Sequence, residues 1–156
     1  MSSRYSQGNY SVQNPEKFVG QKQPFARSSW EMAFMRFCDS HPNITKWASE
    51  NVKIPYRHPF TGKITNYVPD FMVQYTDKNG SQHVELVEIK PSTQTSLKNA
   101  RSRGDAMQTA LNAAKWTAAQ EWCQRKGIRF KVINEDQIFR NNKPRKPKQR
   151  VAKKRK

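Results

Sequence analysis

Three residues in the middle of the chain have the types and the spacing to assist hydrolysis of a phosphate ester. Asp70 follows a proline, and Glu88 and Lys90 are separated by one residue. Mg²⁺ prefers oxygen ligands and commonly takes only one or two protein carboxylates when phosphate oxygens complete its shell. A lysine beside such an ion could orient the attacking water or offset charge on the phosphate. These residues therefore predict a divalent-metal site, with the backbone carbonyl of Ile89 as a third protein ligand.

The three side chains can meet only if neighbouring strands carry them. The sequence between residues 52 and 90 predicts an antiparallel meander, because turn residues such as Asn79-Gly80 separate apolar segments. Residues two apart in a strand point to the same side, so Glu88 and Lys90 share a face. Counting back through the second turn brings Asp70 level with Glu88. The three predicted strands are Val52–Arg57, Ile64–Tyr75 and Gln82–Lys90.

A helix is predicted before this meander. It begins after Ser28 or Ser29, which are good N-cap residues, and it ends at the segment Ser40–Pro42. Between these limits, aromatic and other apolar residues recur at helical spacing. Glu31 falls in the first turn of this helix.

A second helix is predicted after the meander, over Asp105–Lys126, with Gly127 as its C-terminal stop. A short helical piece near Ser96–Arg103 precedes it. A strand over Ile128–Ile133 follows it and is expected to run parallel to Gln82–Lys90. The core-facing stripe of the long helix is predicted to consist of Met107, Ala110, Leu111, Ala114, Ala118 and Trp122.

The element order α, β, β, β, α, β predicts one α/β domain with a mixed central sheet flanked by helices. A chain of 156 residues is long enough for one hydrophobic core. We expect an extended polar arm over residues 1–26 that wraps the domain or a partner, a globular domain over 27–139, and a disordered basic tail over 140–156. Cys38 and Cys123 lie in helical patterns without metal-ligand spacing, so they are expected to be buried, reduced thiols.

The charge of the chain indicates a polyanionic partner, with nucleic acid the foremost. The formal net charge is +17, and residues 140–156 contain ten basic and no acidic residues. Residues 1–139 still have a net charge of +7, from 19 basic and 12 acidic residues. No apolar segment approaches the roughly 20 residues of a membrane-spanning helix, and the N-terminus lacks the apolar centre of a signal peptide. An intracellular protein without a membrane partner is therefore expected.

The order of the candidate residues resembles the motif of the PD-(D/E)XK nucleases, in their TnsA-like branch. Glu31 lies in a helix, Pro69-Asp70 in a strand, and Glu88-Ile89-Lys90 in the next strand. The resemblance extends from about residue 27 to residue 138 and implies a fold similar to that of restriction endonucleases. It also implies that Asp70 and Glu88 bind a divalent metal, that Lys90 is the catalytic lysine, and that Glu31 is an accessory carboxylate and a possible ligand. The implied cofactor is Mg²⁺, for which Mn²⁺ could substitute.

The short length, the basic tail and the layout resemble more closely the head-completion nucleases of large contractile-tailed phages. This resemblance implies an endonuclease or exonuclease that acts on packaged, double-stranded DNA before tail joining. It further implies phage head or portal proteins as partners, and a location in the host cytoplasm or in the virion. Contacts with DNA are predicted for Arg27, Lys115, Lys143, Arg145, Lys146, Lys148, Arg150, Lys153, Lys154, Arg155 and Lys156.

Each of these features has an alternative explanation. Asp70, Glu88 and Lys90 could form a solvated charge cluster across two strands. Glu31 could be an acid that stabilises the helix N-terminus through the macrodipole, Arg27 and Lys115 could be solvated surface residues, and the tail could serve solubility. The chain could also be a DNA-binding or virion structural protein without catalysis, or an RNA-binding protein of ribosomal type. The oligomeric state is left open.

Overall fold

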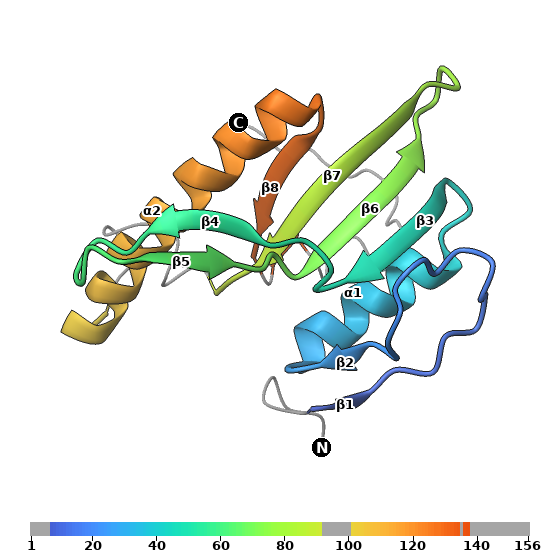
Figure 1. Cartoon of the computed structure of the whole chain (residues 1–156). Helices are drawn as coiled ribbons and strands as arrows, with labels where there is room; N and C mark the ends of the chain where they lie inside the picture. The colour runs from blue at the N-terminus through green and yellow to red at the C-terminus, as the bar shows by residue number, and fades with distance from the viewer. Residues whose placement is uncertain (1–6, 92–100, 135, 138–156) are drawn as a thin grey trace, which may run out of the picture.

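A four-stranded mixed sheet with strand order β3-β6-β7-β8 forms the centre of the fold (Figure 1). The computed structural model describes residues 7–91, 101–134, 136 and 137. Strands β3, β6 and β7 pair antiparallel, whereas β8 runs parallel to β7. The predicted mixed sheet and the predicted parallel last strand are therefore confirmed. The strands are β3 (Ile44–Ser49), β6 (Phe71–Thr76), β7 (Gln82–Ile89) and β8 (Arg129–Ile133).

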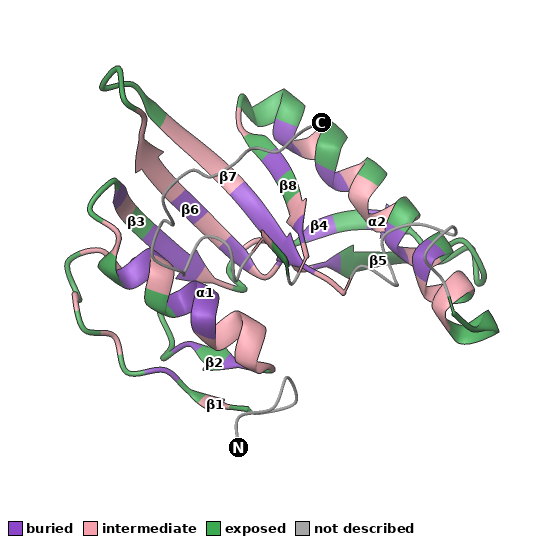
Figure 2. Ribbon diagram, turned by 180° about the vertical axis from the view of Figure 1, so that it is seen from behind, coloured by how far each residue is buried: buried purple, intermediate pink, exposed green. Residues whose placement is uncertain are grey.

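The helices α1 (Ser29–Ser40) and α2 (Arg103–Lys126) cover opposite faces of this sheet. Neighbouring residues of β7 show this directly, since side chains alternate between the faces of a strand. Val87 belongs to a buried cluster with Phe34 of α1, and Leu86 belongs to a second cluster with Ala119 of α2. Figure 2 shows buried residues on α1 and on the strands that it faces. The flanking helices predicted from the sequence are thus in place.

Both helices begin and end with local hydrogen bonds of the kind their sequences predict. The Ser28 hydroxyl accepts the backbone N–H of Glu31 at 3.2 Å, and the Ser102 hydroxyl accepts that of Asp105 at 3.0 Å. Gly127 ends α2 with φ at 75°, a left-handed conformation that glycine adopts without strain. The helix starts two residues before the predicted Asp105. Of the predicted short helical piece, residues 96–100 lie outside the described part of the chain.

The prediction of one long strand over Ile64–Tyr75 is wrong. The segment divides into β5 (Ile64–Tyr67) and β6, with a break at residues 68–70. Pro69 stands in this break and has no backbone N–H to donate to a ladder, so the chain leaves one sheet here and enters another. Strand β5 pairs with β4 (Ile54–Arg57) in a separate two-stranded sheet that packs on α2. The three-stranded meander is therefore replaced by two hairpins in different sheets (Figure 1).

The sequence analysis also missed β3, so the predicted element order α, β, β, β, α, β is incomplete. This strand forms an edge of the central sheet and pairs with β6, which lies more than twenty residues further along the chain. Its Trp47 is fully buried and contacts the rings of Tyr10, Phe18 and Phe71. A pairing between such distant segments is poorly predicted by local sequence patterns.

The predicted inner stripe of α2 is wrong at two positions. Met107 and Ala110 are exposed, and the buried positions are Thr109, Ala119 and Cys123 together with Asn112. Alanine occurs on several sides of this helix, so apolar spacing defines its inner face poorly. The remaining members of the predicted stripe pack partly buried against the core, namely Leu111, Ala114, Ala118 and Trp122. Both cysteines are buried and free, as expected.

Residues 7–26 of the predicted arm lie against the domain and include regular elements. These are β1 (Gly8–Asn9) and β2 (Phe25–Ala26), which pair with each other. Between them the chain is anchored on Asp39 in the last turn of α1. The Asp39 carboxylate accepts the Tyr10 hydroxyl at 2.6 Å and the backbone N–H groups of Gln13 at 2.7 Å and Asn14 at 3.0 Å. The predicted basic tail, residues 140–156, lies outside the described residues.

In the described part of the chain, no helix is long and apolar enough to cross a membrane.

Replacing Asp39 should destabilise the protein. Asp39→Ala would leave one hydroxyl and two amides without their acceptor, and an unsatisfied buried polar group costs about 1–3 kcal/mol. We therefore expect Asp39→Ala to lower the free energy of unfolding by roughly 3 kcal/mol or more, and Tyr10→Phe, which removes one of these bonds, by about 1 kcal/mol. Urea unfolding at pH 7 measures both variants. A wild-type stability of Asp39→Ala would contradict the anchoring role.

The pH dependence of this effect has a definite sign. Burial raises the pKa of Asp39, but hydrogen bonds from Tyr10, Gln13 and Asn14 outweigh it, so the net pKa is lowered. A carboxyl with a lowered folded-state pKa contributes stability above its unfolded pKa, near 4, and loses it as the pH falls through the folded value. The stability difference between the wild type and Asp39→Asn should therefore shrink as the pH is lowered below about 4.

Candidate active site

The two candidate carboxylates meet where β6 begins and β7 ends. Phe71 pairs with Val87, so the next position outward places Asp70 opposite Glu88. The backbone N–H of Ile89 donates to Asp70 Oδ2 at 2.8 Å, and the backbone N–H of Asp70 donates to Glu88 Oε1 at 3.3 Å. Each carboxylate is thus held by the backbone of the opposite strand. The juxtaposition expected from counting through the hairpin is confirmed, although Asp70 lies just before the strand and not within it.

Lys90 lies beside Glu88 one residue beyond the end of β7. Its backbone N–H donates to the carbonyl of Ile133 at 3.0 Å, which continues the pairing with β8 and fixes the direction of the side chain. The Lys90 Nζ atom is 3.5 Å from Glu88 Oε2. The two side chains therefore share a face, as the period of a strand predicts.

Tyr67 adds a hydroxyl to the site from the other sheet. Its side chain is buried at the end of β5, and its hydroxyl donates to Glu88 Oε1 at 2.8 Å. The Lys115 Nζ atom of α2 lies 5.7 Å from the centre of the Tyr67 ring. Tyr67 was not predicted from the sequence, because it belongs to no motif. Its hydroxyl contacts Glu88 only because the chain changes sheets at Pro69.

The negative charges of the site are only partly compensated by neighbouring groups. Burial, followed by the charges of Glu88 and Glu31, raises the pKa of Asp70 well above its ordinary value. Burial also raises the pKa of Glu88, against the opposing effects of Lys90 and Tyr67. Burial and the nearby Lys90 lower the pKa of Lys115. Such a cluster of perturbed groups is typical of functional sites, and a cation placed between the carboxylates would relieve their repulsion.

Glu31 lies in the first turn of α1 and interacts electrostatically with the carboxylate pair. Its Oε1 atom accepts the backbone N–H of Arg27 at 3.0 Å, so the side chain takes part in the cap of α1. Burial raises the pKa of Glu31, and its charge is felt at Asp70. Within residues 7–91, 101–134 and 136–137, however, no three His, Cys, Asp or Glu side chains are close enough together to hold one metal ion. The role of Glu31 as an accessory carboxylate therefore stays a prediction.

The predicted DNA contacts fall in three places. Lys115 is half-buried and lies next to Tyr67. Arg27 is exposed and lies just before α1. The Arg27 guanidinium binds Glu50 through Nε at 3.0 Å and through Nη2 at 3.1 Å. The arginine side chain is 59% exposed, so this pair contributes little to stability and can exchange for a phosphate. The remaining predicted contacts, Lys143, Arg145, Lys146, Lys148, Arg150, Lys153, Lys154, Arg155 and Lys156, lie outside the described residues.

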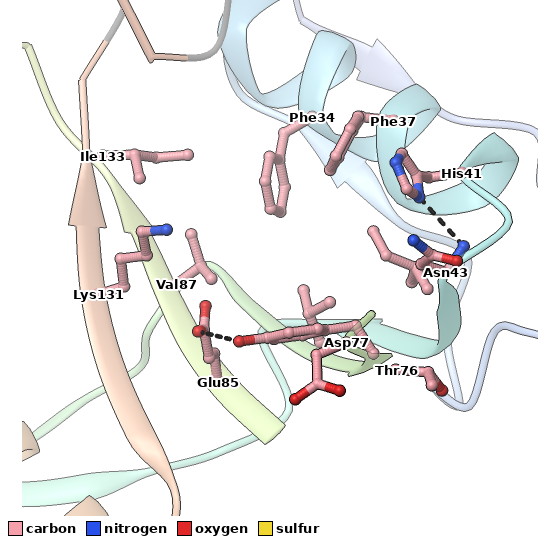
Figure 3. Close-up of a pocket in the computed structure, with 13 residues that line it drawn as sticks. Phe34, Phe37, His41, Asn43, Thr76, Asp77, Glu85, Val87, Lys131 and Ile133 are labelled. Atoms are coloured by element: carbon pink, nitrogen blue, oxygen red, sulfur yellow. Dashed lines mark hydrogen bonds between the residues drawn. The ribbon is translucent and has the colours of Figure 1, made fainter. Parts of the chain in front are cut away.

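A separate apolar pocket of about 390 Å³ opens between α1 and the sheet (Figure 3). Phe34 and Phe37 of α1 line it together with Val87 and Ile133 of the sheet. It extends toward the turn at Asp77, which is the end of the β6–β7 hairpin opposite the carboxylates. None of the candidate catalytic side chains lines this pocket.

Comparison with known proteins agrees with the geometry of the carboxylate pair. Residues 41–135 match the model of the TnsA-like endonuclease N-terminal domain, a range that includes Asp70, Glu88 and Lys90. The chain is also 31% identical over 140 residues to the head completion nuclease of Enterobacteria phage T4, and the alignment covers 83% of this chain and 91% of that protein. As the order of its acidic and basic residues predicted, this chain belongs to the family of TnsA-like endonucleases.

Proposed function

We propose that the protein is a divalent-metal-dependent nuclease that hydrolyses phosphodiester bonds of double-stranded DNA. The observation that supports this proposal best is the pairing of Asp70 with Glu88 across β6 and β7, with Lys90 Nζ at 3.5 Å from Glu88 Oε2. Two carboxylates and an amine at one end of a sheet suit a hard cation held against a phosphate. Membership of an endonuclease family supports the same reaction.

The donor set fits Mg²⁺, with Mn²⁺ as a substitute. Asp70 and Glu88 would bind the ion through oxygens, and Mg²⁺ takes few protein carboxylates because water and phosphate complete its shell. The Ile89 carbonyl is the proposed third ligand. The N–H and C=O groups of a strand residue face the same neighbour, and the Ile89 N–H already points at Asp70. When bound, the ion would polarise the phosphoryl oxygen and lower the pKa of a water molecule.

The side chains around the carboxylates have roles of their own in this proposal. Lys90 presents three N–H donors on a flexible stem, so it can orient the attacking water or hold a phosphate oxygen. Glu88 keeps this ammonium at the site. Lys115 supplies a second positive charge from α2, on the side of Tyr67. Glu31 would act as an accessory carboxylate for a second ion or a water molecule.

The biological setting follows from the phage relative. The aligned region covers 83% of this chain and 91% of the T4 head completion nuclease, so the two proteins correspond over most of their lengths. We propose that this chain also acts in phage head completion, on packaged DNA before tail joining, in the cytoplasm of the host. Head or portal proteins would then be its partners. The net charge of +17 favours binding to the DNA backbone.

Loss of either proposed catalytic group should abolish cleavage while leaving DNA binding intact. Asp70→Asn removes a charged metal ligand and Lys90→Ala removes the ammonium, so each should slow cleavage by about 100-fold or more. Supercoiled plasmid incubated with Mg²⁺, and then with chelator, measures the reaction, and a filter-binding assay measures affinity. Asp77→Asn and Lys131→Ala, which change the same residue types away from the site, serve as controls. Undiminished cleavage in both site variants would defeat the assignment.

Metal should stabilise the native protein by relieving the repulsion between Asp70 and Glu88. A ligand that binds only the native state contributes about 2.7 kcal/mol at 100 times its dissociation constant. The melting temperature should therefore rise with Mg²⁺ in the wild type and stay constant in Asp70→Asn. Because the pKa values of both carboxyls are raised, protons compete with the ion. At a subsaturating Mg²⁺ concentration, the rise in the melting temperature of the wild type should be larger at pH 8 than at pH 5.5. If Mg²⁺ raised the melting temperature of Asp70→Asn as much as that of the wild type, the ion would bind elsewhere.

The basic tail should contribute to the salt dependence of DNA binding. Each phosphate that a protein neutralises adds about 0.9 to the slope of log affinity against log salt. A chain cut after Phe139 lacks ten basic residues, so its slope should be clearly shallower than that of the full chain. Titrations with duplex DNA at several salt concentrations give both slopes, and competition with structured RNA tests the choice of nucleic acid. Identical slopes would remove the tail from DNA binding.

A further inference from the structure

Tyr67 brings a hydroxyl from a different sheet onto one oxygen of Glu88. The ring of Tyr67 belongs to the buried cluster formed by the β4–β5 hairpin, α2 and the adjacent face of the central sheet. Its side chain is only 4% exposed, and its hydroxyl donates to Glu88 Oε1 at 2.8 Å. The β4–β5 hairpin therefore contacts the carboxylate pair through the buried hydrogen bond between Tyr67 and Glu88.

The hydrogen bonds divide the four carboxylate oxygens into two sets. Glu88 Oε1 accepts both the Tyr67 hydroxyl and the backbone N–H of Asp70, and Asp70 Oδ2 accepts the backbone N–H of Ile89. Glu88 Oε2 faces Lys90, with 3.5 Å between the oxygen and Nζ. Among the described residues, no donor makes a hydrogen bond to Glu88 Oε2 or to Asp70 Oδ1. One oxygen of each carboxylate is thus committed to hydrogen bonds within the protein, whereas Asp70 Oδ1 accepts none from the described residues and Glu88 Oε2 has only the ion pair with Lys90.

We propose that Tyr67 is a positioning residue that restricts Glu88 to binding the metal through Oε2 alone. This inference rests on the proposed function. With Tyr67 and the Asp70 amide on Oε1, a bidentate approach would break two hydrogen bonds. Single-oxygen ligation suits Mg²⁺, which needs near-octahedral geometry and keeps several waters, whereas Ca²⁺ takes six to eight ligands and often binds carboxylates through both oxygens. Tyr67 therefore makes the site selective for the smaller ion.

The alternative is that Tyr67 serves packing only. Its ring contacts Phe130, and the Lys115 ammonium lies over its face at 5.7 Å from the centre. Tyr67→Phe separates the two explanations, because phenylalanine keeps the ring and removes only the hydroxyl. Tyr75→Phe is a matched control, since the Tyr75 hydroxyl of β6 donates to Glu85 Oε2 of β7 at 2.8 Å, near the end of the β6–β7 hairpin opposite the carboxylate pair.

The test measures the binding of Mg²⁺ and of Ca²⁺ to the full chain by calorimetry, for the wild type and both variants. Loss of a residue that orients a metal ligand typically weakens metal affinity 10- to 100-fold. We expect Tyr67→Phe to weaken Mg²⁺ binding by roughly this factor and Ca²⁺ binding less, so that the preference for Mg²⁺ falls. Tyr75→Phe should leave both affinities unchanged. In cleavage assays, Tyr67→Phe should raise the half-saturating Mg²⁺ concentration while the rate at saturating Mg²⁺ stays within a few-fold of wild type.

The outcomes distinguish this inference from the proposed function. A wild type that binds Mg²⁺, beside a Tyr67→Phe variant with the same affinity and the same preference over Ca²⁺, overturns the positioning role alone. A wild type that neither binds Mg²⁺ nor cleaves DNA overturns both. Melting in the presence of chelator reports folding without the ion. If Tyr67→Phe and Tyr75→Phe lose Mg²⁺ affinity equally, the effect is a general one of packing and the positioning role is rejected.

Discussion

The register between β6 and β7 is the constraint on which the site depends. Pairing of Phe71 with Val87 places Asp70 opposite Glu88. Because side chains alternate between the faces of a strand, a slip of one residue would turn Glu88 toward the other face of the sheet. Leu86 and Val87 oppose such a slip, since they belong to different buried clusters on opposite faces. The hydrophobic pattern of β7 thereby fixes the position of Glu88 at its end, and of Asp70 opposite it.

Two adjacent carboxylates in a partly buried position oppose folding, and the raised pKa values of Asp70 and Glu88 express this cost. Backbone amides from the opposite strand, the Tyr67 hydroxyl and the charge of Lys90 offset part of it. The apolar clusters on both faces of the sheet supply the remaining stability. A cluster of carboxylates whose charges are only partly compensated, inside a well-packed fold, is typical of function placed at the expense of local stability.

The sequence predicts the features that depend on nearby residues. The cap at Ser28, the stop at Gly127 and the alignment of Asp70 with Glu88 each follow from a few neighbouring positions or from counting through one short turn. Features that depend on distant segments were missed. Strand β3 is defined by its pairing with β6, and Tyr67 reaches Glu88 only because the chain changes sheets at Pro69. The lack of an N–H on proline is the one local signal of that change.

Glu31 belongs to the cap of the first helix, and its charge acts on the carboxylate pair. It lies before the segment that matches the family model, and its carboxylate accepts the N–H of Arg27 at the start of α1. Burial, followed by the charges of Glu88 and Glu31, raises the pKa of Asp70, and burial is also the largest cause of the raised pKa of Glu31, to which the charge of Glu88 adds. A cation held by Asp70 and Glu88 would therefore favour the ionised form of Glu31. Since an ionised acid stabilises a helix N-terminus more strongly, such a cation would also strengthen the cap of α1.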